Sequence, residues 1–274
     1  MSLSTFTDPR AHERNAYVRG FRNWSAALRA LILREIWRHG RTKWTMFTFA
    51  LQFLEPVGVI AAFGFIVYVL LRVPPYGPST ILFHATGIVP YYYFIRVSGR
   101  TRSFEVDRAN RLPCSDSLDD FLILCFMDFI VMSVGTVILF WGLSIFVSPL
   151  AIPIDPWACV TSVVLVSILA CGINLVNAAI IHLTKAWVTI LIVLFRGLML
   201  ISGVIFVVDF MPPNIRFWLN LNPLSHAIMW FRMGIYPHYP VHTLDKAYLV
   251  WFALGSLVVG LAVERATRNF EDGQ

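Results

Sequence analysis

The segment from Phe121 to Val147 reads FLILCFMDFIVMSVGTVILFWGLSIFV and decides the class of fold. It contains a single charged residue, Asp128, and is longer than the roughly 20 apolar residues that a helix needs to cross a bilayer. Backbone N–H and C=O groups in lipid must be paired within the segment itself, so a strand or a loop is excluded. The segment therefore predicts a membrane-spanning α-helix.

The rest of the chain has the same character. Of its 274 residues, 57% are hydrophobic and only 14% are charged, and the mean hydropathy is +0.67. A soluble domain has about 25% charged residues. Six apolar runs have the length of a span: Met46 to Leu71, Thr80 to Ser98, Phe121 to Val147, Trp157 to Ile181, Trp187 to Val208 and Ala247 to Val263.

These runs predict an all-α integral membrane protein with six transmembrane helices. We expect one transmembrane domain over residues 1–274, in which residues 46–264 form the six-helix bundle. Residues 1–45 are expected to form a cytoplasmic tail with an interfacial helix, and residues 265–274 a second cytoplasmic tail.

The positions of the basic residues predict the orientation. Sixteen of the 22 Lys and Arg lie on the side that holds both termini, and four lie in the loops on the other side. Short cytoplasmic loops retain Lys and Arg, so both termini are expected to be cytoplasmic. The net charge of +6 does not indicate nucleic-acid binding, because the basic residues flank apolar segments.

Two segments outside the six runs have a pattern of their own. Between Arg19 and Ile36, apolar residues share one helical face and arginines the other, which is typical of an amphipathic helix on the membrane surface. The segment from Phe210 to Pro240 is too apolar for a solvated loop and too rich in proline to cross. There we predict two short re-entrant helices that form a gate on the outer side, the first starting at Pro212-Pro213 and the second running from Leu224 to Gly234.

Three charges lie inside the predicted spans: Glu55 in the first, Asp128 in the third and Arg196 in the fifth. An unpaired charge at such a depth costs roughly 2.5–3.5 kcal/mol, so these side chains should face protein or a wet cavity. Either carboxylate could pair with Arg196 and fix the packing of the helices. Alternatively, Arg196 could line the route of an anionic substrate.

Polar and aromatic residues within the spans leave two interpretations open. Asn174 and Asn177 share a face of the fourth span and could either join helices or line a conduit. Tyr91 and Tyr92 could anchor their helix at the interface or stack on sugars.

No catalytic site is recognisable. The sequence contains no Gly-Lys pair, hence no Walker A loop, and neither H-E-x-x-H nor G-x-S-x-G. We therefore expect no catalytic, cofactor-binding or metal-binding residues. A membrane-embedded transferase acting on a lipid carrier is the alternative of another class, but its possible histidines, His84, His182 and His226, are scattered.

Several short stretches, in this order and spacing, resemble type 2 ABC transporter permeases of the capsular polysaccharide export group. They are Leu33-Arg34-Glu35, Leu54-Glu55-Pro56, Thr86-Gly87-Ile88-Val89-Pro90, Ile201-Ser202-Gly203-Val204-Ile205-Phe206, Met211-Pro212-Pro213, Asn222-Pro223-Leu224 and Phe231-Arg232. Relatives commonly have Phe-Pro where this chain has Leu112-Pro113, and Glu where it has Asp128.

The resemblance implies an ATP-driven exporter of lipid-linked capsular polysaccharide in a bacterial inner membrane. This chain would be its membrane subunit, paired with a second copy and with two copies of a cytoplasmic ATPase that binds the ATP and Mg²⁺. A periplasmic co-polymerase and an outer-membrane channel are the further expected partners. Exporters of O-antigen, teichoic acid, small lipids or drugs share the architecture and stay as alternatives.

The same resemblance implies that the N-terminal surface helix and the loop after the second run contact the ATPase. The candidates for coupling to the ATPase are Arg34, Glu35, Arg38, Arg108 and Asp116. A polysaccharide is too long for an enclosed pocket, so we expect a continuous aromatic and polar groove. Its candidate lining residues are Tyr91, Tyr92, Asn174, Asn177, Arg196, Trp230 and Tyr236.

Overall fold

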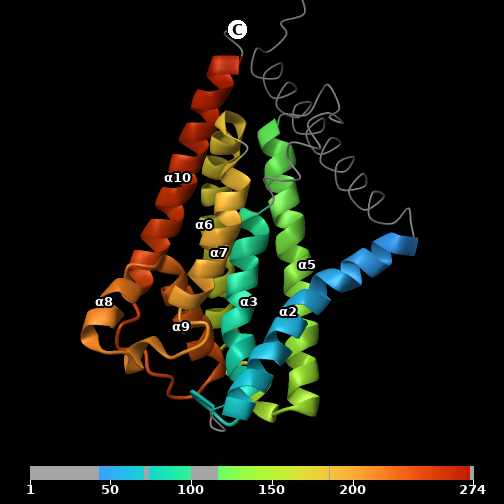
Figure 1. The fold of residues 1–274 in the computed structure, drawn as a ribbon, viewed down its shortest axis with the longest axis vertical. Helices are drawn as coiled ribbons and strands as arrows, with labels where there is room; N and C mark the ends of the chain where they lie inside the picture. The colour runs from blue at the N-terminus through green and yellow to red at the C-terminus, as the bar shows by residue number, and fades with distance from the viewer. Residues whose placement is uncertain (1–42, 71–73, 100–116, 185, 272–274) are drawn as a thin grey trace, which may run out of the picture. The chain divides into compact units, whose positions relative to one another are not determined.

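The computed structural model describes residues 43–70, 74–99, 117–184 and 186–271. Within these ranges the chain is helical and contains no strand, as predicted. The long helices are α2 (Lys43–Leu70), α3 (Thr80–Ser98), α5 (Ser117–Phe146), α6 (Pro156–Leu183), α7 (Trp187–Ile201) and α10 (Lys246–Glu271). Between α7 and α10 lie the short helices α8 (Pro213–Asn220) and α9 (Pro223–Ile235), and 3-10 turns occupy Pro149–Ala151 and Val208–Phe210 (Figure 1).

The chain divides into two compact units. One comprises Met1–Ala50 with Leu112–Leu124, and the other comprises Leu51–Arg111 with Cys125–Gln274. All packing described below lies within the second unit. The expectation of a single transmembrane domain therefore stays a prediction.

Among the described residues, three helices are long and apolar enough to cross a membrane: Cys125–Phe146, Pro156–Ile181 and Lys246–Thr267. Leu54–Ile66 and Trp187–Ile201 are apolar but shorter. This is the composition of a membrane protein, whereas the count of six spans stays a prediction.

The fifth predicted run is shorter than expected. It was expected to continue to Val208, but α7 ends at Ile201 and the chain turns at Gly203, whose φ is +71°. A left-handed residue cannot continue a helix, and glycine adopts this conformation without strain. The 15 residues of α7 extend about 22 Å at 1.5 Å per residue, less than the roughly 30 Å of the hydrocarbon layer.

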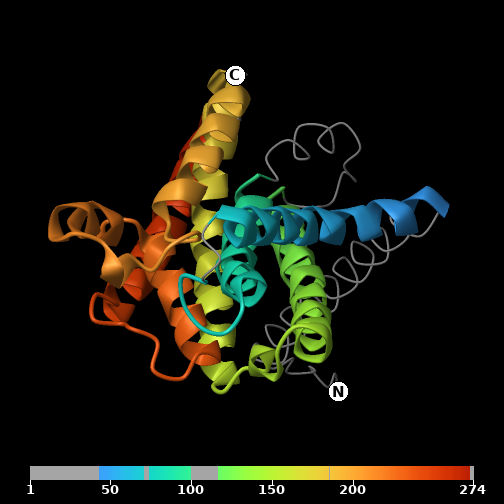
Figure 2. The same ribbon diagram turned by 60° about the horizontal axis from the view of Figure 1, so that its bottom comes forward.

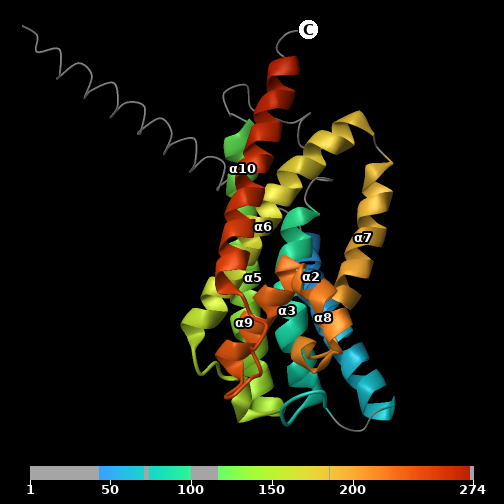
Figure 3. The same ribbon diagram turned by 90° about the vertical axis from the view of Figure 1, so that its left-hand side faces the viewer.

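Helices α6 and α10 pack backbone against backbone and lie side by side in Figures 1 and 3. A Cβ on Gly172 would lie 2.3 Å from the carbonyl carbon of Ser256, and one on Gly260 would lie 2.5 Å from the carbonyl oxygen of Gly172. Each helix thus fills the place where the other lacks a side chain. Small residues permit this approach, which gives close van der Waals packing in lipid.

Helix α3 is buried along most of its length, with an unbroken run of buried residues from Leu82 to Tyr91. The Ser79 hydroxyl caps its N-terminus by accepting from the backbone N–H of Leu82 (3.4 Å). It packs against α6 and α9, and Figure 3 shows it between α6 and α7. Its position lets α3 contribute both to a groove with α7 and to the contacts of α9.

The two short helices α8 and α9 confirm the prediction for the segment between the last two runs. Pro213 occupies the first turn of α8 and Pro223 that of α9, where a missing N–H costs nothing. The Asn222 side chain caps α9 through the N–H of Leu224 (3.0 Å) and donates to the Ser202 hydroxyl (2.8 Å). Figure 2 shows both helices beside the lower part of α10. Whether they re-enter a membrane and form a gate stays a prediction.

His226 joins the two short helices to the start of α10. Its Nδ1 accepts from the backbone N–H of Asp245 (3.1 Å), so Nε2 carries the proton and donates to the carbonyl of Asn220 (2.8 Å). The Tyr248 ring packs on it at 5.2 Å. Burial lowers the pKa of His226, although the Asn220 carbonyl and the Asp245 charge partly oppose this. The fold therefore holds a neutral imidazole.

Acidification is expected to destabilise this junction. A histidine whose folded pKa lies below its ordinary value stabilises the fold fully above about pH 6.5 and loses that contribution as the pH falls toward the folded pKa. Between about pH 7.5 and pH 5.5, the thermal midpoint should therefore fall by about 2 °C more in the parent than in His226→Gln. Equal shifts in the two proteins would show that His226 does not contribute.

Candidate functional site

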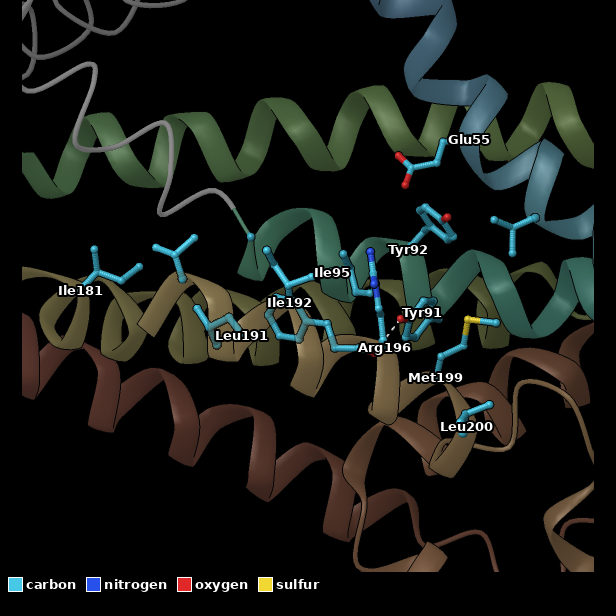
Figure 4. Close-up of a pocket in the computed structure, with 14 residues that line it drawn as sticks. Glu55, Tyr91, Tyr92, Ile95, Ile181, Leu191, Ile192, Arg196, Met199 and Leu200 are labelled. Carbon is cyan, nitrogen blue, oxygen red and sulfur yellow. Dashed lines mark hydrogen bonds between the residues drawn. The ribbon is translucent and has the colours of Figure 1, made fainter. Parts of the chain in front are cut away.

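A groove of about 580 Å³ lies among α2, α3 and α7 (Figure 4). Glu55 and Val59 of α2 form one side, Tyr91, Tyr92 and Ile95 of α3 form the base, and α7 contributes the opposite side. The residues of α7 are Val188, Leu191, Ile192, Phe195, Arg196, Met199 and Leu200. The groove is apolar along most of its length and carries two tyrosines and two opposite charges.

A hydrogen bond and a ring contact fix the base of the groove against α7. The Tyr91 hydroxyl donates to the carbonyl of Phe195 (2.8 Å), and the Phe94 and Phe195 rings meet edge to face at 5.9 Å. Tyr91 and Tyr92 also meet edge to face, at 5.8 Å. Tyr91 is buried and its hydroxyl is occupied, whereas Tyr92 is half-buried. Tyr92 therefore offers the accessible aromatic face.

The charges of the groove are exposed. Glu55 and Arg196 both lie on exposed positions of their helices, and in Figure 4 both side chains extend into the space beside Tyr92. Within the described residues no ion pair joins them. Arg196 can thus reach an anionic or polyhydroxylated ligand with its five N–H donors.

The other candidates for a conduit lie elsewhere. Asn174 is fully buried, and Asn177 accepts from the indole N–H of Trp187 (3.1 Å), which joins α6 to α7. Trp230 lies 5.1 Å from the Lys246 ammonium, and Tyr236 is buried beside Tyr76 and Tyr239. The structure therefore brings together only Tyr91, Tyr92 and Arg196 of the seven candidates.

Asp128 has a partner other than the one considered from the sequence. Its Oδ1 lies 3.9 Å from Nε of Arg96, so the pair joins α5 to α3 and does not involve Arg196. The Asp128 side chain is 6% exposed and that of Arg96 is 20% exposed. Arg96 lies at the end of the second apolar run, where the sequence offered no reason to pair it with the third.

The candidates for coupling to an ATPase, namely Arg34, Glu35, Arg38, Arg108 and Asp116, lie outside the described residues, as does the expected N-terminal amphipathic helix. Their roles stay predictions. The described part of the predicted site is therefore the groove among α2, α3 and α7.

Arg232 of α9 was not expected to be structurally important. From the sequence it counts only as one of the basic residues on the outer side, within the second predicted short helix, yet it is fully buried and donates to oxygens of α3 and of the turn after α7. Its place within an apolar helix, between Phe231 and Met233, is the one signal that could have revealed this.

The described residues define a helical membrane protein with a charged and aromatic groove among its helices. No family model matches the sequence. The chain is similar to two curated proteins of Escherichia coli, both named polysialic acid transport protein KpsM. Each is 25% identical over 256 residues, which cover 90% of this chain and 95% of the relative. The similarity thus extends over nearly the whole length of both proteins.

Proposed function

We propose that this chain is the membrane-spanning subunit of an ATP-driven exporter of lipid-linked polysaccharide. The observation that carries the proposal is the similarity to a polysialic acid transport protein over 90% of this chain and 95% of the relative. The motifs that resemble type 2 ABC transporter permeases support the same class.

The proposal includes a membrane topology, a set of partners and the division of labour with the ATPase. The six apolar runs cross a bacterial inner membrane, the fifth of them as the shorter helix α7, with both termini in the cytoplasm and α8 and α9 forming a periplasmic gate. The chain pairs with a second copy and with two copies of an ABC ATPase, which supply ATP binding and hydrolysis. A periplasmic co-polymerase and an outer-membrane channel receive the polymer. The subunit itself has no enzymatic activity.

The groove suits a polymer of sugars for a physical reason. Sugar rings stack on aromatic faces with their apolar side, and their hydroxyl and carboxylate groups accept hydrogen bonds from arginine. Tyr92 and Arg196 offer these two kinds of contact side by side, on neighbouring helices. An open groove also accommodates a chain of any length, which an enclosed pocket cannot.

The proposal is tested by deleting this chain from its host and staining the cell surface for polysaccharide. Loss of surface polymer with accumulation inside the cell, together with co-purification of an ATPase, is the expected result. Polymer that still reaches the surface would overturn the proposal. ATPase activity of the purified complex that responds to hydrophobic drugs and not to a capsule-type glycolipid would indicate a drug exporter instead.

Arg196→Ala is expected to lower the rate of export about tenfold. A hydrogen bond to a charged group contributes about 1.5–3 kcal/mol, and 1.4 kcal/mol corresponds to a factor of ten. Arg196 is exposed, so subunit assembly should not change. Arg265→Ala on α10, also an exposed arginine but outside the groove, is the matched control and should export normally. Unchanged export by Arg196→Ala would remove this residue from the groove's function.

A further inference from the structure

Arg232 is the largest fully buried side chain of the described residues, and its guanidinium is surrounded by oxygen atoms. It donates to the carbonyls of Gly203 (2.8 Å), Val204 (2.7 Å), Phe206 (3.2 Å) and Phe83 (3.4 Å). It also donates to the hydroxyls of Thr86 and Tyr239, both at 3.3 Å. These contacts come from all three of its nitrogens.

No carboxylate is among these partners in the described part of the chain. A buried charge is costly unless hydrogen bonds replace its water, and here four carbonyls and two hydroxyls do so. The Phe83 ring adds a cation–π contact, because the guanidinium carbon lies 3.9 Å from the ring centroid. Lysine cannot reproduce the arrangement, since only the planar guanidinium has five N–H donors in a fixed fork.

The backbone is shaped to admit this side chain. A Cβ on Gly87 of α3 would lie 2.7 Å from Nη2 of Arg232 and 2.8 Å from the carbonyl oxygen of Val204. The left-handed Gly203 turns the chain after α7, and its carbonyl is one of those that accept from Arg232. Arg232 thus ties α9 to two separate segments: α3, and the turn that follows α7.

The contacts of α3 extend from this cage to the groove. Thr86 and Phe83 accept hydrogen bonds from Arg232. Five residues after Thr86 on the same helix, Tyr91 donates to the carbonyl of Phe195 in α7 and lines the groove. At the end of the same helix, Arg96 pairs with Asp128. Helix α3 therefore both forms the base of the groove and holds α9 through Arg232.

We propose that Arg232 is a positioning residue that couples α9 and the α7–α10 connection (residues 202–245) to α3. A displacement of α3 at the groove then moves the short helices with it. The coupling rests on the proposed export function. The attachment itself is a property of this chain and is measurable without a substrate.

The experiment compares the full-length parent with Arg232→Met, which keeps an unbranched apolar stem and removes the hydrogen-bond donors. Hydrogen exchange of residues 202–210 and of α9 is measured in the purified chain. Exported polymer per ATP hydrolysed is then measured in the reconstituted complex with its ATPase. We expect at least tenfold faster exchange, a tenfold lower ratio of export to hydrolysis, and ATP hydrolysis within twofold of the parent.

Milder variants keep the test decisive if Arg232→Met does not fold. Thr86→Val removes the acceptor of Nε, and should raise exchange and lower the export ratio by a few fold. Thr86→Ser keeps the hydroxyl and should restore both values. Arg265→Met on α10, an exposed arginine outside residues 202–245, is the matched control and should leave both values unchanged.

Two results would overturn the proposal. Unchanged exchange in residues 202–210 and α9 would show that Arg232 does not hold the connection. Faster exchange in which export and ATP hydrolysis fall together would leave Arg232 a purely structural residue without a role in coupling. A parent complex that exports nothing would remove the proposed function, and the coupling with it, while the exchange measurement would still decide whether Arg232 holds the connection.

Discussion

Gly172→Val is expected to separate α6 from α10 and to prevent normal assembly of the chain. The first atom of the new side chain would lie 2.3 Å from the carbonyl carbon of Ser256 and 2.5 Å from the nitrogen of Leu257. Both are backbone atoms, so no side-chain rotation relieves the clash. Overpacking of a tight contact costs about 3 kcal/mol, and movement of a whole helix costs other contacts as well. The measurement is the thermal stability of the purified protein in detergent.

Gly255→Val on α10 is the matched control. No atom lies within 4 Å of a Cβ at this position, so its thermal midpoint should stay close to that of the parent. Gly260→Val should behave like Gly172→Val, because its Cβ would lie 2.5 Å from the carbonyl oxygen of Gly172. Equal stability of Gly172→Val and Gly255→Val would contradict the close approach of the two helices.

Asp128→Leu is expected to weaken the attachment of α5 to α3 by about 2 kcal/mol. Removal of one partner of a fully buried ion pair costs roughly 3–5 kcal/mol of stability. The cost here is smaller, because Arg96 is partly exposed and its Nε lies 3.9 Å from Oδ1 of Asp128. The hydrogen bond from Tyr93 to Ser133 (3.0 Å) also joins α5 to α3 and remains. The helix should therefore stay attached, with a lower thermal midpoint.

The double variant Arg96→Met/Asp128→Leu separates the interaction from the loss of either side chain. It replaces both charges by apolar groups, and a buried pair replaced in this way is often as stable as the original. The double variant should therefore be more stable than Asp128→Leu alone. If the double variant is less stable than Asp128→Leu alone and than Arg96→Met alone, the two residues contribute to stability independently.

The sequence predicts those elements best whose boundaries depend on local chemistry. The run Thr80 to Ser98 coincides with α3, whose N-terminus is capped by Ser79. The prolines at 213 and 223 and the asparagine at 222 place α8 and α9 within a few residues of their predicted positions. In each case a proline, a cap or a loss of apolar character marks the boundary in the sequence itself.

Features that depend on contacts between distant segments were not predictable. The partner of Asp128 is set by the way α3 packs against α5, which periodicity does not specify. The hydrogen bonds of Arg232 join residues up to 149 positions apart. Tyr91, Tyr92 and Arg196 do share a groove, whereas Asn174, Asn177, Trp230 and Tyr236 satisfy the same criterion of polar or aromatic character and lie elsewhere.

The contact of Gly172 with Gly260 also limits which parts of the molecule can change their arrangement. Two helices whose backbones touch cannot rotate about their own axes without collision, so α6 and α10 act as a single rigid frame. Helix α7, by contrast, buries only Leu191 along its whole length. A widening of the groove therefore requires displacement of α2, α3 or α7, while α6 and α10 keep their arrangement.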